Sequence, residues 1–435
     1  MGTRNKCGVN RQAVVIIHGM GEQRPMDTLR SFVNAIKKHL EDLDDSEKNT
    51  RLRSKADGVS EIYETRRLSL SASKKRPITD FYEFYWAHNM RNNSFQDILL
   101  WLLKLLFSRR KKIPKRLGLV WCTVWLLLLF SIITVVAVTQ IVGVNKINSL
   151  LSAFVALPTL ISIITLSIKS SFLNSIGDAG RYFTPSPNNI GERSRIRQQG
   201  ITFLKKIHDT TSNEKYGRII VVAHSLGSVI AYDLLRLLWT EYNESYGHVS
   251  VIDQSAISEI EIQCNKADGI TNPVSFQHLQ YKCWMQQKSV GNKWLISDFI
   301  TIGSPLCNAD YLLMNNVSFD ELKNQREFPS CPPVLDDITK TIHYNSKPYN
   351  VEEKIRTVKI LHHAALFAIT RWTNIYFSSD FIGGPMQRLF GKGVKDESIV
   401  RKSLWFFPGG HTNYWDFDNK ASLSKIVEAL RLKTR

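Results

Sequence analysis

The chain has 435 residues, of which 43% are hydrophobic and 10% aromatic, so it can bury a substantial core. This composition excludes a disordered, collagen-like or coiled-coil protein. The formal net charge of +18 favours an anionic partner, either nucleic acid or a membrane surface.

Six cysteines are scattered through the chain without any C-x-x-C pair. A secreted fold held by disulfides is usually small and dense in cysteine, so this pattern favours a reducing compartment. The polar first residues lack the apolar core of a signal peptide, and we expect none.

The first predicted strand is residues 13–17, a β-branched run (AVVII) typical of a strand buried on both faces of a parallel sheet. After the sequence HGMG at residues 18–21, apolar residues recur at helical spacing between residues 29 and 40. An alternating aromatic run at residues 80–86 predicts the next strand.

Two long segments without charged residues follow, at residues 117–144 and 147–168. A helix needs about 20 apolar residues to cross the hydrocarbon core of a bilayer, and both segments reach that length. We therefore predict a transmembrane hairpin of two spans. The alternative is a buried helical hairpin in a soluble core, although the segments lack the polar stripe that such helices usually carry.

The charges that flank the hairpin are asymmetric. Six basic residues crowd the entry to the first span between residues 109 and 116, whereas the loop between the spans offers only Lys146. The positive-inside rule then places both ends of the hairpin, and the bulk of the protein, on the cytoplasmic side. Just upstream, the apolar residues 95–107 are too few to cross and predict either an interfacial helix or a core helix.

The most informative segment is residues 218–238, which reads as a strand at residues 218–223, the turn AHSLG and an amphipathic helix. Small residues stand two before and two after Ser225, at Ala223 and Gly227, and allow a sharp turn that projects the hydroxyl outward. The same turn places a helix N-terminus beneath that hydroxyl, where it stabilises negative charge. We predict a nucleophile elbow at Ser225, the alternative being a simple helix cap.

Further strands are predicted at residues 297–302 and 371–377, from the apolar runs SDFITI and RWTNIYF. Strands that alternate with helices along the chain are typical of one fold class. The sequence predicts the α/β class, with a mostly parallel sheet and helices on both faces.

The elbow and the sequence IIHGMG near the N-terminus together resemble the α/β-hydrolase superfamily, specifically its lipase and esterase branch. The run AHSLGSVIAYDLL is similar to intracellular phospholipase-like members of that branch. The resemblance implies one hydrolase domain in two parts, residues 1–94 and 171–435, interrupted by the membrane segment at residues 95–170. It also implies a cap or lid at residues 240–293, where the family carries insertions.

The resemblance implies roles for residues around the nucleophile. His18 and Gly19, after the first strand, would lie beside Ser225. The backbone N–H groups of Met20 and Leu226 would form the oxyanion hole. His224 and Gly227 belong to the elbow motif, and His224 is expected to support the turn.

The triad order in this fold is serine, acid, histidine. Asp380 stands in the loop after a late strand, where the family places its carboxylate. His411 stands in a Gly-rich loop before a final helix, which matches the catalytic histidine of the family. In this chemistry a neutral imidazole takes the proton of the serine hydroxyl, and the carboxylate fixes the imidazole tautomer.

Other residues compete for these roles. Asp310, Asp416 and Asp418 are the alternatives to Asp380, with Asp310 the strongest of them. His362 and His363 lie in an apolar helical run and are expected to pack. No metal-binding motif is present, and no G-K-S/T follows the glycines at residues 383 and 384, so no metal or cofactor is expected.

These features predict a membrane-anchored serine ester hydrolase of lipase or phospholipase type, which acts on an ester or lipid substrate through an acyl-serine intermediate. A thioesterase or acyltransferase with the same triad is the alternative among enzymes, and an inactive membrane-tethered interaction protein is the alternative outside them. Nucleic acid is not expected as a partner, because the densest basic cluster adjoins a predicted span and no nucleic-acid motif is present. Acyl specificity, physiological role and oligomeric state are not predicted.

Overall fold

The computed structural model describes most of the chain outside the region between residues 91 and 188. Within that region it describes only Arg110, scattered positions between 118 and 136, and Tyr182. The other described ranges are 11–19, 24–90, 189–209, 215–246, 253–266, 269–312, 318–345, 349–351, 354–380, 382–400 and 409–433.

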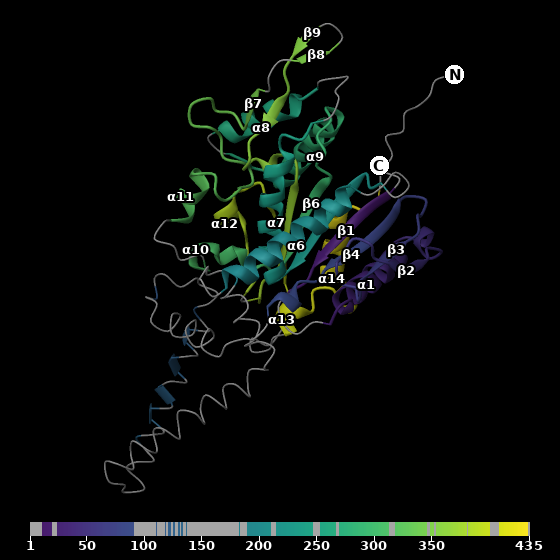
Figure 1. The fold of residues 1–435 in the computed structure, drawn as a ribbon. Helices are drawn as coiled ribbons and strands as arrows, with labels where there is room; N and C mark the ends of the chain where they lie inside the picture. Colours follow the sequence, from purple (N-terminus) through teal and green to yellow (C-terminus); the bar gives the residue numbers. More distant parts are fainter. Residues whose placement is uncertain are drawn as a thin grey trace.

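A sheet of eight strands, in the order β12-β11-β6-β5-β1-β4-β3-β2, forms the centre of the molecule (Figure 1). The six strands from β12 to β4 are parallel to one another, and β3 and β2 continue the sheet antiparallel. The strands of this sheet are β1 (Arg11–Ile17), β2 (Leu52–Ala56), β3 (Arg66–Leu70), β4 (Ile78–Phe84), β5 (Arg218–His224), β6 (Ile296–Ile302), β11 (Arg371–Phe377) and β12 (Lys395–Ile399). The predicted α/β class with a mostly parallel sheet is confirmed.

Two small antiparallel ladders lie outside the main sheet. One pairs β7 (His343–Asn345) with β10 (Lys359–Leu361), and the other pairs β8 (Tyr349–Val351) with β9 (Lys354–Arg356). The described α-helices are α1 (Asp27–Leu43), α6 (Ile190–His208), α7 (Leu226–Tyr242), α8 (Ser255–Asn265), α9 (Pro273–Ser289), α10 (Ala309–Leu312), α11 (Phe319–Asn324), α12 (Gln387–Phe390), α13 (Gly409–Thr412) and α14 (Lys420–Leu430).

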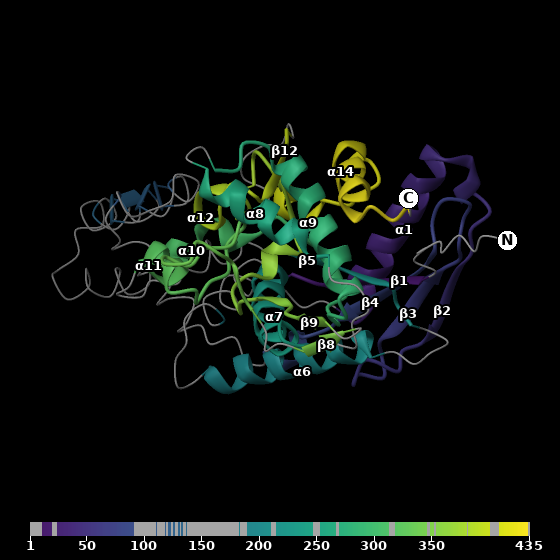
Figure 2. The same ribbon diagram turned by 90° about the horizontal axis from the view of Figure 1, so that it is seen from above.

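Helices cover both faces of the sheet, which explains why its central strands are apolar throughout. Along β1, Val14 and Ile16 pack in a core shared with α1 and α14, whereas Val15 and Ile17 pack in a core shared with α6, α7 and α9. Figure 2 shows α1 and α14 on one side of the strands and α6 and α7 on the other. Strands buried on both faces lose the polar alternation of a half-exposed strand.

The strands predicted from the sequence are present, and their ends differ from the prediction by no more than two residues. The strand predicted at residues 80–86 is β4, which ends at Phe84 because Trp86 leaves the ladder. The Trp86 indole N–H instead donates to the His18 carbonyl oxygen at 3.0 Å. In the main sheet, β2, β3 and β12 were not predicted, and neither were the strands of the two small ladders, β7 to β10.

The membrane hairpin was predicted at residues 117–144 and 147–168, which lie largely outside the described residues, as do residues 95–107. Within the part of the chain that is described, no helix has both the length and the apolar composition needed to cross a bilayer. Seven large apolar side chains between residues 118 and 136 are described and are 41–65% exposed: Trp125, Leu126, Leu129, Phe130, Ile132, Ile133 and Val136.

The stretch at residues 240–293, predicted as a cap or lid, contains α8 and α9. Helix α9 packs against the sheet, where the Gln277 amide donates to the Trp372 carbonyl oxygen of β11 at 3.0 Å. Phe276 and Trp284 are fully buried in the core. These two side chains therefore belong to the core of the molecule; the cap itself stays a prediction.

Candidate active site

Ser225 stands at the turn between β5 and α7, with φ 51° and ψ −130°. Side chains other than glycine rarely adopt a positive φ, and such strain costs about 1–3 kcal/mol. The turn is held by the Ser225 N–H, which donates to the Ile302 carbonyl oxygen at 2.9 Å. A Cβ on Gly227 would lie only 2.3 Å from the His18 carbonyl oxygen, so a glycine there lets α7 begin against the end of β1. The predicted strand, sharp turn and helix are all present.

The Ser225 hydroxyl and the His411 imidazole lie together, although 186 residues separate them in the sequence. His411 Nε2 is 2.7 Å from Ser225 Oγ, and His411 Nδ1 is 2.9 Å from Asp380 Oδ2. An ionised carboxylate only accepts hydrogen bonds, so Nδ1 carries the proton and Nε2 accepts from the serine hydroxyl. The structure thus joins the three residues predicted for the triad in the order that the chemistry requires.

Asp380 is buried and is held at both carboxylate oxygens. Oδ1 accepts the Ile382 N–H at 2.9 Å, and Oδ2 accepts the Tyr414 hydroxyl at 2.6 Å as well as the imidazole. Burial raises the pKa of Asp380, but the charge and hydrogen bond of His411 outweigh it and hold the pKa at about 2. The carboxylate is therefore ionised at every pH where the imidazole acts as a base.

The competing acids lie elsewhere. Asp310 forms an ion pair with Arg388, with 2.9 Å between Nη1 and Oδ2, in a partly exposed position. Asp416 and Asp418 are exposed. The geometry therefore favours Asp380 over all three.

The paired histidines are not part of this arrangement. His362 is buried, and its Nε2 lies 3.1 Å from the Val334 carbonyl oxygen, which is a packing role. His363 is exposed.

Part of the predicted oxyanion hole is described. Leu226 is the first residue of α7, so its N–H is one of the donors that a helix leaves without an intrahelical partner. Gly19 lies against the nucleophile, because a Cβ on it would be 2.9 Å from Ser225 Cβ and 2.8 Å from His224 Nδ1. Met20, predicted to supply the other N–H, lies outside the described residues.

Two buried neutral histidines flank the turn. His18 Nδ1 donates to the Gly19 carbonyl oxygen at 2.8 Å, and its ring stacks on Trp86. His224 Nε2 donates to the His411 carbonyl oxygen at 2.9 Å, which fixes the backbone that carries the imidazole. Burial lowers the pKa of His18 to about 4 and that of His224 to about 3. Both rings are therefore neutral near pH 7 and act as hydrogen-bonded supports.

Three residues around the triad acid were missed by the sequence reasoning. Tyr414 donates to Asp380, and Gly303 and Gly383 make room for the two side chains. A Cβ on Gly303 would lie 2.8 Å from Tyr414 Cε2, and one on Gly383 would lie 2.9 Å from Asp380 Oδ2. The sequence offered a weak signal, since Gly303 directly follows the strand predicted at residues 297–302, and Gly383 was considered only as part of a phosphate-binding loop and rejected.

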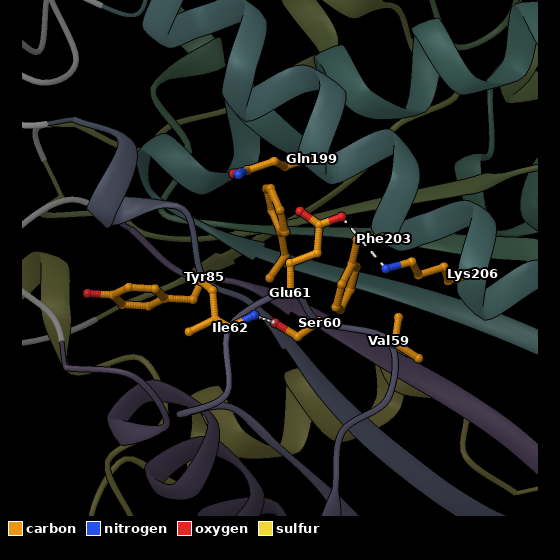
Figure 3. Close-up of a pocket in the computed structure, with 9 residues that line it drawn as sticks. Val59, Ser60, Glu61, Ile62, Tyr85, Gln199, Phe203 and Lys206 are labelled. Atoms are coloured by element: carbon orange, nitrogen blue, oxygen red, sulfur yellow. Dashed lines mark hydrogen bonds and ion pairs between the residues drawn. The ribbon is translucent and has the colours of Figure 1, made fainter.

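A small hollow and a larger one lie among the described residues. The smaller, drawn in Figure 3, has a volume of about 20 Å³, which holds roughly one water molecule. Its rim carries an ion pair between Glu61 and Lys206, and none of its lining residues belongs to the triad. The larger, of about 680 Å³, runs between α1 and the segment after His411, from Arg24 to Phe417. Because Thr412 lines it, the larger hollow adjoins the triad.

Comparisons with protein families, with curated proteins and with solved structures find no match to this chain. Its function must therefore be argued from the site itself. Among the described side chains, no group of three or more His, Cys, Asp or Glu is arranged to hold a metal ion.

Proposed function

We propose that the protein is a serine ester hydrolase of the α/β-hydrolase type, with lipase- or phospholipase-like activity. The observation that carries this proposal is the continuous hydrogen-bond chain from Ser225 through His411 to Asp380, placed at a strained elbow. A strained serine and a buried imidazole both lower the stability of the folded protein, so their presence in one buried network is best explained by a function. Nucleophilic catalysis supplies that function.

The proposed reaction has two halves. Ser225 Oγ attacks the ester carbonyl carbon while His411 Nε2 takes the hydroxyl proton, and the carbonyl oxygen becomes an oxyanion. The C–O bond to the leaving alcohol then breaks, and His411 returns the proton to that alcohol. Water attacks the acyl-serine in the same way, which releases the carboxylic acid and restores the hydroxyl.

Two structural features would lower the barrier. The Leu226 N–H stands at the start of α7 next to Ser225 and would donate to the oxyanion in this mechanism, where each such donor contributes about 3 kcal/mol. Asp380 keeps the imidazole in the tautomer that accepts the serine proton, and stabilises the imidazolium once it forms.

We further propose that the segment between residues 91 and 188 holds the catalytic domain at a bilayer, on the cytoplasmic side. Support comes from the two uncharged stretches, from the basic cluster before them, and from the exposed apolar side chains such as Leu126 and Phe130. Retention of the protein in the membrane pellet at alkaline pH is expected. Its release, or equal retention of a variant lacking residues 117–168, would contradict the anchor.

A thioesterase or acyltransferase would use the same acyl-serine with a different leaving group or acceptor. Turnover of matched ester and thioester substrates, with and without added alcohol acceptors, separates these activities. An inactive scaffold would turn over none of them.

The test of the proposed function is turnover of a panel of phospholipids, lysolipids, neutral glycerides and short esters by the purified, detergent-solubilised chain. Ser225→Ala should lower kcat/KM on the preferred ester by at least about 10⁴-fold, and His411→Ala should do the same. Both variants should keep the wild-type melting temperature within a few degrees. Undiminished turnover by either variant would assign the chemistry to other residues.

A further inference from the structure

Tyr414 lies three residues after His411 and is fully buried beside the triad acid. Its hydroxyl is 2.6 Å from Asp380 Oδ2, the same oxygen that accepts the His411 Nδ1–H. The Phe377 N–H, at the end of β11, donates to the Tyr414 oxygen at 3.0 Å. Because that N–H occupies a lone pair of the phenol oxygen, the hydroxyl hydrogen is directed at the carboxylate.

The ring of Tyr414 is fixed from three sides. It stacks on Phe377 with 4.0 Å between ring centroids, and it meets the His224 ring edge-on at 5.9 Å. Gly303, which follows β6, leaves the space that Tyr414 Cε2 occupies. The hydroxyl is therefore placed by the same strands that place the triad, and it has little freedom to turn away from Asp380.

We propose that Tyr414 is a positioning residue for the triad, which acts through Asp380 and rests on the hydrolase function proposed above. Its hydrogen bond holds the carboxylate in the plane that faces the imidazole. It also draws part of the negative charge away from Oδ2, and so moderates how strongly Asp380 holds the imidazolium that forms in each half-reaction.

Of the described residues, the titratable side chains that face Tyr414 and Asp380 are His411 and His224. Burial lowers the pKa of His224 to about 3, so this ring does not change charge between pH 5 and pH 9. His224 therefore adds no change of charge of its own to the pH profile of the proposed catalysis in that range.

A matched control exists at the amino ends of the parallel strands, whereas the triad lies at their carboxyl ends. The buried Tyr216 hydroxyl donates to the buried carboxylate of Asp80 at 2.7 Å, near the amino end of β4. Tyr216→Phe removes the same kind of hydrogen bond as Tyr414→Phe, from a carboxylate that takes no part in the proposed chemistry. Any general cost of losing such a bond is common to both variants.

The experiment compares wild type, Tyr414→Phe, Tyr216→Phe and Ser225→Ala as full chains in detergent, with kcat, KM and the pH profile of kcat/KM on one activated ester. Tyr414→Phe should lower kcat about tenfold with KM within about twofold, since bonds to charged groups are among the stronger ones. Its acid limb should move to higher pH, because the carboxylate then holds the imidazolium more firmly. Tyr216→Phe should leave both kcat and the profile unchanged.

Tyr414→Phe with wild-type kcat and an unmoved profile, while Ser225→Ala is inactive, would overturn the role of Tyr414 alone. Wild-type activity of Ser225→Ala would remove the hydrolase function and this role with it. Should Tyr414→Phe fail to fold, 3-fluorotyrosine at position 414 keeps the hydroxyl and makes it a stronger donor. That substitution should move the acid limb to lower pH, and an unmoved limb would again contradict the proposal.

Discussion

Two buried aspartates, Asp298 and Asp380, lie at opposite ends of the parallel strands and are stabilised in different ways. Asp298, near the amino end of β6, is surrounded by the guanidinium groups of Arg218, Arg371 and Arg431, with N–O distances of 2.7–3.0 Å. Burial raises the pKa of Asp298, but the three positive charges outweigh it and hold that pKa far below the ordinary value. Among the described residues, the partners of this carboxylate are the three arginines and the Ser297 hydroxyl, and none of these groups exchanges a proton near pH 7.

Asp380 instead accepts from an imidazole and a phenol hydroxyl. The side chain of histidine, unlike that of arginine, is a type that can serve as a base in catalysis. The surroundings of Asp298 thus consist mainly of the permanent charges of three arginines. One of them, Arg218, also donates to the Arg431 carbonyl oxygen at 2.9 Å and so holds the residue after α14 against the sheet. A buried carboxylate therefore indicates a catalytic site only when its hydrogen-bond partners can change protonation state.

The largest effect that tests this comparison is expected for Asp380→Asn. An amide in this place favours the imidazole tautomer with the proton on Nε2, which cannot accept from Ser225. We expect kcat/KM for an activated ester to fall about 10⁴-fold while the melting temperature changes little. A folded variant that keeps more than a tenth of the activity would show that Asp380 is another structural carboxylate.

The second effect is expected on stability and not on chemistry. Asp298→Asn leaves the three guanidinium groups of Arg218, Arg371 and Arg431 without their shared anion in a buried site. Such a break costs about 3–5 kcal/mol, which urea denaturation monitored by tryptophan fluorescence would measure. The fraction that stays folded should turn over ester at the wild-type rate per molecule. A free energy of unfolding within 1 kcal/mol of wild type would contradict the structural role of Asp298.

The smallest effect concerns the pH dependence of stability. Burial lowers the pKa of His208 from 6.5 to about 4, so the unfolded chain binds a proton there that the folded protein excludes. Its contribution to stability is complete above pH 6.5 and is lost as the pH falls from 6.5 to about 4. His208→Phe keeps ring packing against Tyr242 and Trp294 and removes the titration.

For that variant, the fall in unfolding free energy between pH 6.5 and pH 5 should be shallower by up to about 1.4 kcal/mol per pH unit. Urea midpoints at the two pH values, measured for wild type and variant, check this directly. Parallel falls in the two proteins would mean that His208 is protonated in the folded state. Activity per folded molecule should be unchanged, because His208 lies in α6, away from the triad.

Much of the fold could be predicted because the parallel strands are continuous apolar runs with helical periods between them. The elbow was predictable for a local reason: Ser225 and Gly227 are neighbours in sequence. Strands β2 and β3 were missed because both are short. Strand β2, at the edge of the sheet, is polar (LRSKA) and pairs with β3, which in turn pairs with β4.

The candidate site was only partly predictable. Asp380 and His411 came from a resemblance to the family in the order of residues and in the loops where they stand. Tyr414 and Gly303 could not be found in this way, because their contact joins residues 111 positions apart and depends on how β6 and β11 pair. The cap predicted at residues 240–293 rested on the position at which the family carries insertions, and a position in the sequence does not show whether aromatic side chains lie in a core or line a cavity.

The central claim is that Ser225 forms a covalent bond during turnover. The most direct measurement is mass spectrometry of peptides after brief treatment of the folded protein with a fluorophosphonate, in which the serine oxygen bonds to phosphorus and fluoride leaves. One adduct is expected, on the peptide containing Ser225; it should be lost in Ser225→Ala and form much more slowly in His411→Ala. An unmodified Ser225 peptide in a protein that still hydrolyses esters would contradict the central claim.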